Sequence, residues 1–188
     1  MRKIIYSMNM TLDGYYAGPN GELDWVIADD ELHDFSTELL SEVEAICFGR
    51  VTYELLAAFW PTAPLLENLP KSELDFAHAI NRIPKFVCSK MLRRVDWENT
   101  TLLNEDIVNV ISRMKQEPDG TLGIGGGAGI LAALMQRDLI DEYRFMYTPV
   151  VLGNGKPLFT TGIEPKRLRL VSTRVFNSGV IVHNYEQT

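Results

Sequence analysis

Residues 121–130 read Thr-Leu-Gly-Ile-Gly-Gly-Gly-Ala-Gly-Ile. The first four have the pattern of a strand, and a helical pattern continues from Ile130 to Met135. Four glycines lie between the two patterns, although consecutive glycines cost conformational entropy on folding. Such glycines occur where a backbone must lie close to something, and successive backbone N–H groups form an anion-binding nest. The stretch predicts a strand, a nest and a helix; the alternative is a glycine-rich turn that serves packing alone.

The spacing of these glycines departs from the strict dinucleotide-binding fingerprint, Gly-x-Gly-x-x-Gly. Counted from Gly125, the third glycine falls on Ile130. The looser form that ends in alanine matches residues 123–128, but the acidic residues at the expected distance, Asp141 and Glu142, precede a strand instead of ending one. The sequence therefore favours a phosphate nest outside the doubly wound dinucleotide fold.

Strand and helix patterns alternate on both sides of this stretch. The alternation predicts one α/β domain over residues 1–188 with a mostly parallel sheet. Residues 177–179, Asn-Ser-Gly, separate two strand patterns and predict a C-terminal antiparallel hairpin. The predicted strands are residues 3–10, 45–48, 85–88, 121–124, 142–151, 168–175 and 180–185, and the predicted helices are residues 30–40, 52–58, 72–80, 106–115 and 130–135.

Composition narrows the classes of partner. The net charge of −7 disfavours nucleic acid and anionic membranes, which both need an excess of Lys and Arg. No run approaches the roughly 18 apolar residues of a membrane helix. Cys47 and Cys88 lie in short apolar runs, which favours buried free thiols in a reducing cytoplasm, and no Cys or His spacing predicts a metal site.

Two further motifs follow predicted strands, at the sheet edge where ligands of parallel sheets bind. The first, Gly49-Arg50-Val51-Thr52-Tyr53, opens a helix, and a helix N-terminus with nearby donors suits a phosphate. Its alternative is a tight turn with Arg50 in solvent. In the second, Ser89 and Lys90 follow the strand 85–88, where a hydroxyl and a cation suit an extra phosphate or form an ordinary solvated turn.

The three motifs occur in one order, and with it the chain resembles the dihydrofolate-reductase-like superfamily. It is most similar to the group that contains the C-terminal domain of the bacterial riboflavin-pathway reductase. The similarity covers nearly the whole chain, from the opening strand and loop at residues 7–18 to the segment at residues 148–159. The resemblance implies a three-layer α/β/α fold with a mostly parallel sheet.

The resemblance also implies hydride transfer from NADPH. Gly49, Arg50 and Thr52 match the family's helix-terminal phosphate site, and Ser89 and Lys90 match its contacts near the adenosine 2′-phosphate. The residues that match its pyrophosphate nest are Gly125, Gly126, Gly127 and Ala128. The family further implies a homodimer, for which the apolar Val171, Val175, Val180 and Val182 of the hairpin offer a contact surface.

On the substrate side, Asp13, Tyr15 and Trp25 match positions that line the nicotinamide and the substrate. The family's proton donor lies on the first helix or acts through water, and the carboxylates near the start of that helix are Asp30, Glu31 and Asp34. Asp30 and, in the first loop, Asp13 are the candidate catalytic residues. Acidic residues at a helix start also serve the helix dipole, which is the alternative for Asp30.

The expected activity is reduction of a small substrate, a heterocycle among the candidates, by a reaction of the 5-amino-6-(5-phosphoribosylamino)uracil reductase type. The chain departs from the family pattern in three places. Ala128 and Ile130 stand where dihydrofolate reductases have a basic or aromatic pair after the triple glycine. Residues 57–64 lack the arginine that holds the folate glutamate, and Tyr15 stands where the riboflavin-pathway group has a basic residue. The alternatives are dihydrofolate reduction, a nucleotide-binding module without catalysis, and a scaffold whose glycines only turn the chain.

Overall fold

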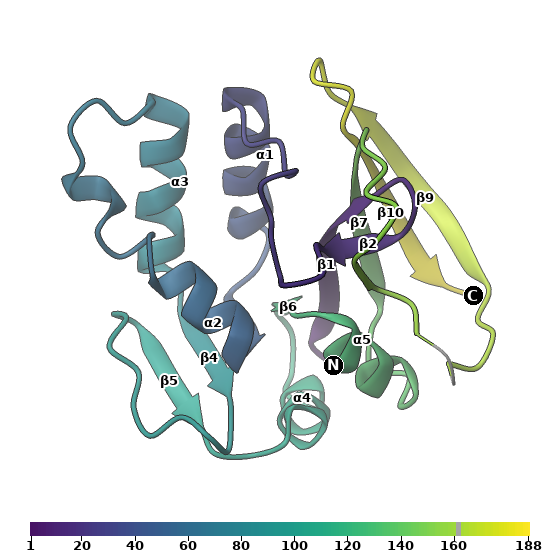
Figure 1. Ribbon diagram of the computed structural model, residues 1–188. Helices are drawn as coiled ribbons and strands as arrows, with labels where there is room; N and C mark the ends of the chain where they lie inside the picture. Colours follow the sequence, from purple (N-terminus) through teal and green to yellow (C-terminus); the bar gives the residue numbers. More distant parts are fainter. Residues whose placement is uncertain (161–162) are drawn as a thin grey trace.

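The computed structural model describes residues 1–160 and 163–188 (Figure 1). In this part of the chain, one large sheet has the order β5-β4-β3-β6-β1-β7-β10-β9. The first six strands in this order are mutually parallel, and β10 is antiparallel to both of its neighbours. The bounds are β5 Thr100–Leu103, β4 Lys85–Cys88, β3 Ala45–Gly49, β6 Thr121–Gly125, β1 Lys3–Thr11, β7 Glu142–Thr148, β10 Ile181–Gln187 and β9 Leu168–Val175. The predicted mostly parallel sheet with a C-terminal antiparallel hairpin is confirmed.

Helices cover both faces of the sheet. The alternation of side chains along β3 divides the core: Ile46 and Phe48 pack with Ile80 of α3, whereas Cys47 packs with Val110 of α4 on the opposite face. The helices of the first face are α1 (Asp30–Ser41), α2 (Arg50–Ala57) and α3 (Lys71–Arg82), and those of the second are α4 (Ile107–Lys115) and α5 (Ala128–Met135) (Figure 1). The predicted three-layer α/β/α architecture is confirmed.

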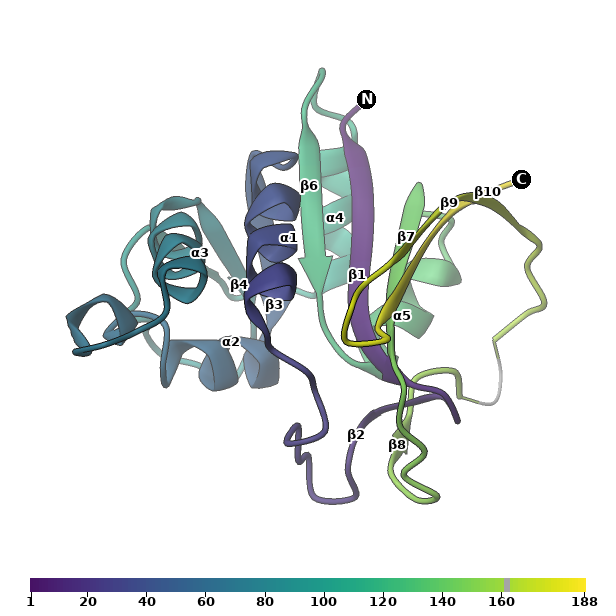
Figure 2. The ribbon, with the colours of Figure 1, turned by 90° about the horizontal axis from the view of Figure 1, so that it is seen from above.

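A small second sheet joins two segments that lie far apart in the sequence. β2 (Tyr15–Ala17) pairs antiparallel with β8 (Lys156–Pro157), and the two lie side by side beyond the end of β1 (Figure 2). Asp13 strengthens this junction, because its carboxylate accepts from the backbone N–H of Gly153 at 2.7 Å. The first loop and the 149–159 segment therefore form one structural unit.

The hairpin corrects one expectation about its apolar residues. Val180 and Val182 are buried, because they pack with Leu32 and Phe35 of α1. Val171 and Val175 of β9 remain exposed, as does Leu170, and β9 is an edge of the sheet. The expected contact surface therefore reduces to the edge strand.

Candidate functional site

The sheet brings the three motifs to one edge. In the register of the parallel strands, Gly49 at the end of β3 lies opposite Cys88 of β4, and Phe48 lies opposite Gly125 of β6. Because parallel strands end at the same edge, the Gly-Arg motif, the Ser89–Lys90 pair and the glycine nest lie next to one another.

Helices that start at this edge differ in how they are capped. α1 and α4 begin after Asp29 and Asp106, whose carboxylates accept backbone N–H bonds of 2.9 Å at Leu32 and Val108. α2 and α5 begin after glycines, and no side chain caps them. Their first N–H groups are therefore available to an anion, and the helix dipoles favour one.

Tyr6, a buried residue of β1, fixes the orientation of the glycine nest from the side of the core. Its buried hydroxyl donates a 2.6 Å hydrogen bond to the carbonyl of Gly126, and burial raises the pKa of this phenol, which keeps it a neutral donor. In a trans peptide the carbonyl and the following N–H point in opposite directions. The bond from Tyr6 therefore turns the N–H of Gly127 away from the core.

The glycines are needed for space. Gly127 has φ −70° and ψ −169°, a conformation that any residue adopts. An added Cβ there would lie 2.8 Å from the ring of Tyr16, and one on Gly126 would lie 2.5 Å from the end of Ile130. The Cβ of any other residue would thus crowd the side chains around the nest.

The cationic and hydroxyl groups of the other two motifs also lie at this edge. Arg50 pairs with Glu54 at 2.7 Å on the same helix. The hydroxyl oxygen of Ser89 accepts from the N–H groups of Met91 and Leu92 at 3.1 Å each, so its O–H proton can still be donated to a ligand. Lys90 is exposed beside it.

A cavity of about 970 Å³ begins at this edge and extends between α1 and the sheet. Eight of the nine predicted cofactor residues line it: Gly49, Arg50, Thr52, Ser89, Lys90, Gly125, Gly126 and Gly127. Ala128 does not, because its side chain is buried in the first turn of α5. The structure therefore gathers the predicted cofactor contacts around a single space.

The predicted substrate and acid residues lie elsewhere. Asp13, Tyr15, Trp25 and Asp30 are not among the described residues that line the cavity. Asp13 ties the first loop to the 149–159 segment, and the hydrogen bond from Thr11 is the main reason that its pKa is lowered. Asp30 accepts a hydrogen bond from Ser72 of α3, and the indole N–H of Trp25 donates to its own loop. The substrate and catalytic roles of these four residues stay predictions.

Other side chains line the cavity instead. Tyr16, the neighbour of Tyr15, lies over the nest. Ser7 and Asn9 of β1 also line the cavity, and they alternate with core residues along the strand. Polar residues at every second position of a strand lie on the same face of the sheet, so this spacing in the sequence could have indicated both residues. From α1 come His33 and Ser36; the ring of His33 packs against Trp60 and Phe76, with centroid distances of 6.3 and 6.1 Å.

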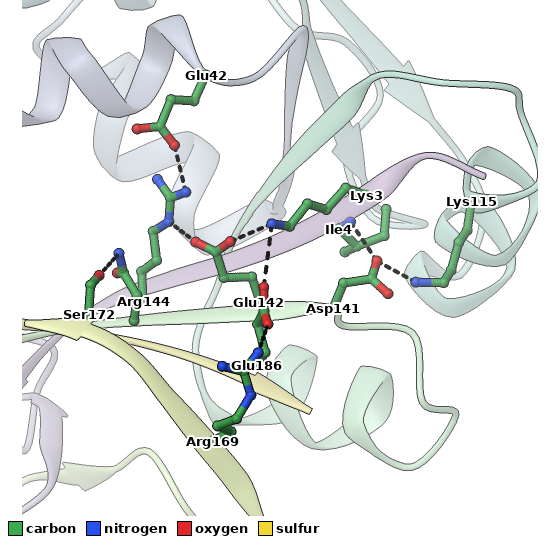
Figure 3. A network of polar contacts seen from close by, with 11 residues as sticks. Lys3, Ile4, Glu42, Lys115, Asp141, Glu142, Arg144, Arg169, Ser172 and Glu186 are labelled. Atoms are coloured by element: carbon green, nitrogen blue, oxygen red, sulfur yellow. Dashed lines mark hydrogen bonds and ion pairs between the residues drawn. The ribbon is translucent and has the colours of Figure 1, made fainter. Parts of the chain in front are cut away.

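Arg144 of β7 also lines the cavity, and two carboxylates neutralise its positive charge (Figure 3). Its guanidinium donates to Glu142 and, at 2.6 Å, to Glu42 at the end of α1. Glu142 also pairs with Lys3 at 2.7 Å. Burial by itself raises the pKa of Glu142, but the bonds from Lys3 and Arg144 outweigh it and lower the pKa overall.

None of the helices in the described residues has the length and apolar character to cross a membrane. The same residues contain no group of three or more His, Cys, Asp or Glu side chains placed to hold a metal ion.

Residues 2–182 match the family model of the RibD C-terminal domain. The chain belongs to this family. The match covers the nest, both other motifs and β1 to β9, so the resemblance expected from the motifs is confirmed.

Relatives of this RibD C-terminal domain agree in length and fold. The chain is 32% identical over 180 residues to the uncharacterized protein YyaP of Bacillus subtilis, with 96% of this chain and 92% of that protein covered. A putative riboflavin biosynthesis protein from Shewanella sp. PV-4 superposes with a TM-score of 0.75 at 22% identity, over 99% of each chain. Dihydrofolate reductase from Enterococcus faecalis, solved with NADP(H), has a TM-score of 0.64 at 11% identity, over 99% of this chain and 96% of that one. The fold is dihydrofolate-reductase-like.

Proposed function

We propose that this protein is an NADPH-dependent reductase related to the riboflavin-biosynthesis reductases, and that it transfers a hydride to a C=N or C=O bond of a small substrate. The observation that carries the proposal is the convergence of three phosphate-suited motifs on one cavity in a chain of this family. Bound NADPH would supply the hydride.

The residues at the sheet edge fit this cofactor. The N–H groups of Gly125, Gly126 and Gly127 would hold the pyrophosphate, since Tyr6 orients the nest. The ring of Tyr16 lies over Gly127 and would border the bound phosphates. The uncapped start of α2, with Thr52 and Arg50, would hold a second phosphate oxygen. Ser89 and Lys90 would bind the 2′-phosphate through charge-assisted bonds.

The proton that completes the reduction needs a donor inside the cavity. We assign it to His33 in preference to Asp30 and Asp13, because the carboxylates of those two are engaged outside the cavity whereas the ring of His33 lines it. Imidazole gains and loses a proton near neutral pH, which suits a general acid. The distance from donor to substrate would be of hydrogen-bond length or bridged by water.

Lys90 tests the cofactor assignment. The Lys90→Ala variant should bind NADPH roughly tenfold more weakly, the effect of losing about 1.4 kcal/mol in one charge-assisted bond, and should bind NADH as the wild type does. Dissociation constants for both cofactors at one fixed salt concentration measure this. Arg93→Ala removes a nearby exposed charge outside the cavity and serves as the control. Equal weakening of both cofactors by Lys90→Ala would show that this lysine does not contact the 2′-phosphate.

We further propose a cytoplasmic homodimer that forms along the β9 edge, where Leu170, Val171 and Val175 are exposed. Light scattering should give about 43 kDa, twice the 21.3 kDa of one chain. The Val171→Lys variant should lower this mass by placing a charge in the contact. A wild-type mass of one chain at working concentration would exclude the dimer.

We expect weak or no reduction of dihydrofolate by this protein. Residues 57–64 contain no arginine for the folate glutamate, and Trp60 of this stretch lines the cavity. If the protein were instead a nucleotide-binding module without catalysis, it would bind NADPH, but no member of a broad panel of carbonyl and imine substrates would oxidise the cofactor. Oxidation of NADPH by any one of these substrates would show that the protein is an enzyme.

A further inference from the structure

The cavity has two parts of different chemistry. The part at the sheet edge carries the glycines and charged residues of both signs, Arg50 and Lys90 with Glu105 and Asp106. The other part lies between α1 and the sheet and is here called the α1 half. Apolar side chains line it on the sheet side and on the helix side. Its apolar side chains come from the sheet, from α1 and from the α2–α3 region: Ile5, Ile46, Met146, Leu32, Leu39, Leu40, Trp60 and Phe76.

The polar groups of the α1 half are nearly all uncharged. Ser7, Asn9 and Thr148 come from the sheet, and Ser36 comes from α1, where its hydroxyl already donates to the carbonyl of Leu32 at 2.8 Å. Among the described residues of α1, no Asp or Glu lines the cavity. His33 is the titratable side chain that this helix presents there.

Among the described residues that line this half, the buried cation is already paired with carboxylates. Arg144 is only 6% exposed and donates to the carboxylates of Glu142 and Glu42 (Figure 3). A substrate phosphate or carboxylate placed against this guanidinium would also meet two negative charges. Lys156 lines the cavity as well, but it is an exposed residue near Gly21 at the rim.

An ion buried without a partner is strongly disfavoured, whereas apolar surface is stabilised in a space of this kind. We propose that the α1 half binds an uncharged, largely apolar carbonyl compound, such as an aromatic or conjugated ketone, in place of a phosphorylated or otherwise ionic substrate. The inference rests on the proposed function: the hydride from NADPH adds to the carbonyl carbon, a proton adds to the oxygen, and the products are the alcohol and NADP⁺.

A neutral apolar probe tests the α1 half without any turnover. N-phenyl-1-naphthylamine carries no charge and fluoresces when it leaves water. Titrated into the wild-type protein, with and without NADPH, it should bind with a micromolar dissociation constant, and uridine 5′-monophosphate should not displace it from the NADPH-loaded protein. Displacement by the nucleotide from the loaded protein, or no binding of the probe, would overturn the proposal.

Two neighbouring positions on α1 supply a matched pair of variants. Ser36 and Thr37 both donate a hydroxyl bond to the carbonyl one turn back, but only Ser36 lines the cavity. Ser36→Asp should weaken the probe at least tenfold, and Thr37→Asp should leave it unchanged. If Ser36→Asp fails to fold, His33→Asp replaces it with the same expectation. Unchanged probe binding in the folded cavity variant contradicts the inference.

The same proteins separate this inference from the proposed function. If the probe binds as expected but NADPH does not bind, the reductase proposal fails and the apolar site stands. If NADPH binds and only ionic substrates are reduced, the apolar site fails and the reductase stands.

Discussion

Gly127→Asp is expected to weaken NADPH binding at least a hundredfold while the protein stays folded. The variant adds a carboxylate where the nest would hold a pyrophosphate, and the two negative charges would repel each other at the start of α5, which no side chain now caps. The added Cβ would also meet the ring of Tyr16. A hundredfold loss corresponds to about 2.7 kcal/mol.

Folding should tolerate this change. Aspartate is at least as good as glycine at a helix N-cap, and Gly127 already has a backbone conformation open to every residue. We expect urea denaturation to show a free energy of unfolding lower by about 1–3 kcal/mol, because the new Cβ must displace the ring of Tyr16. Asn154→Asp adds the same charge on an exposed loop outside the cavity and should leave NADPH binding unchanged. If Gly127→Asp bound NADPH like the wild type, the nest would have no role in binding the cofactor.

Arg144→Met is expected to lower the free energy of unfolding by about 3 kcal/mol, the range seen when one partner of a buried ion pair is removed. Arg144 and Glu142 are 6% and 7% exposed, and the substitution leaves Glu142 with Lys3 as its remaining cation (Figure 3). Urea denaturation measures the loss. Adding Glu142→Gln to the variant should recover part of it, because the buried charge disappears. A double variant no more stable than Arg144→Met would contradict this explanation.

Acid should act on the same network. The pKa of Glu142 in the folded protein lies below its ordinary value of 4.5, so its ionised form stabilises the fold above that pH. The contribution is lost as the pH falls from 4.5 through the lower folded pKa. The stability of Glu142→Gln should accordingly change less than that of the wild type over this acidic range.

The sequence was sufficient for features that depend on local pattern. The alternating strands and helices, the hairpin around Asn177 and the three motifs are each encoded within a few neighbouring residues. Strand β5 was missed, because its four residues have no period that distinguishes them from a loop. The β2–β8 sheet was missed because its pairing joins residues about 140 positions apart, which single-sequence patterns do not encode.

The substrate side was predicted less well because it depends on which way each side chain faces. Asp30 and His33 are one turn apart on α1, yet only His33 lines the cavity, while Asp30 is bonded to Ser72 of α3. Tyr15 and Tyr16 are adjacent on β2, so their side chains face opposite sides, and only Tyr16 lines the cavity. The direction in which these side chains face depends on how α3 packs against α1 and how β8 pairs with β2. The local sequences of α1 and β2 carry no information about these contacts.

Calorimetric titration of the wild-type protein with NADPH, and then with NADH, tests the central claim most directly. We expect one NADPH per chain with a dissociation constant of ~10 µM or tighter, about −7 kcal/mol, and NADH at least tenfold weaker. Absence of NADPH binding at millimolar concentration, or equal affinity for both cofactors, would contradict the account.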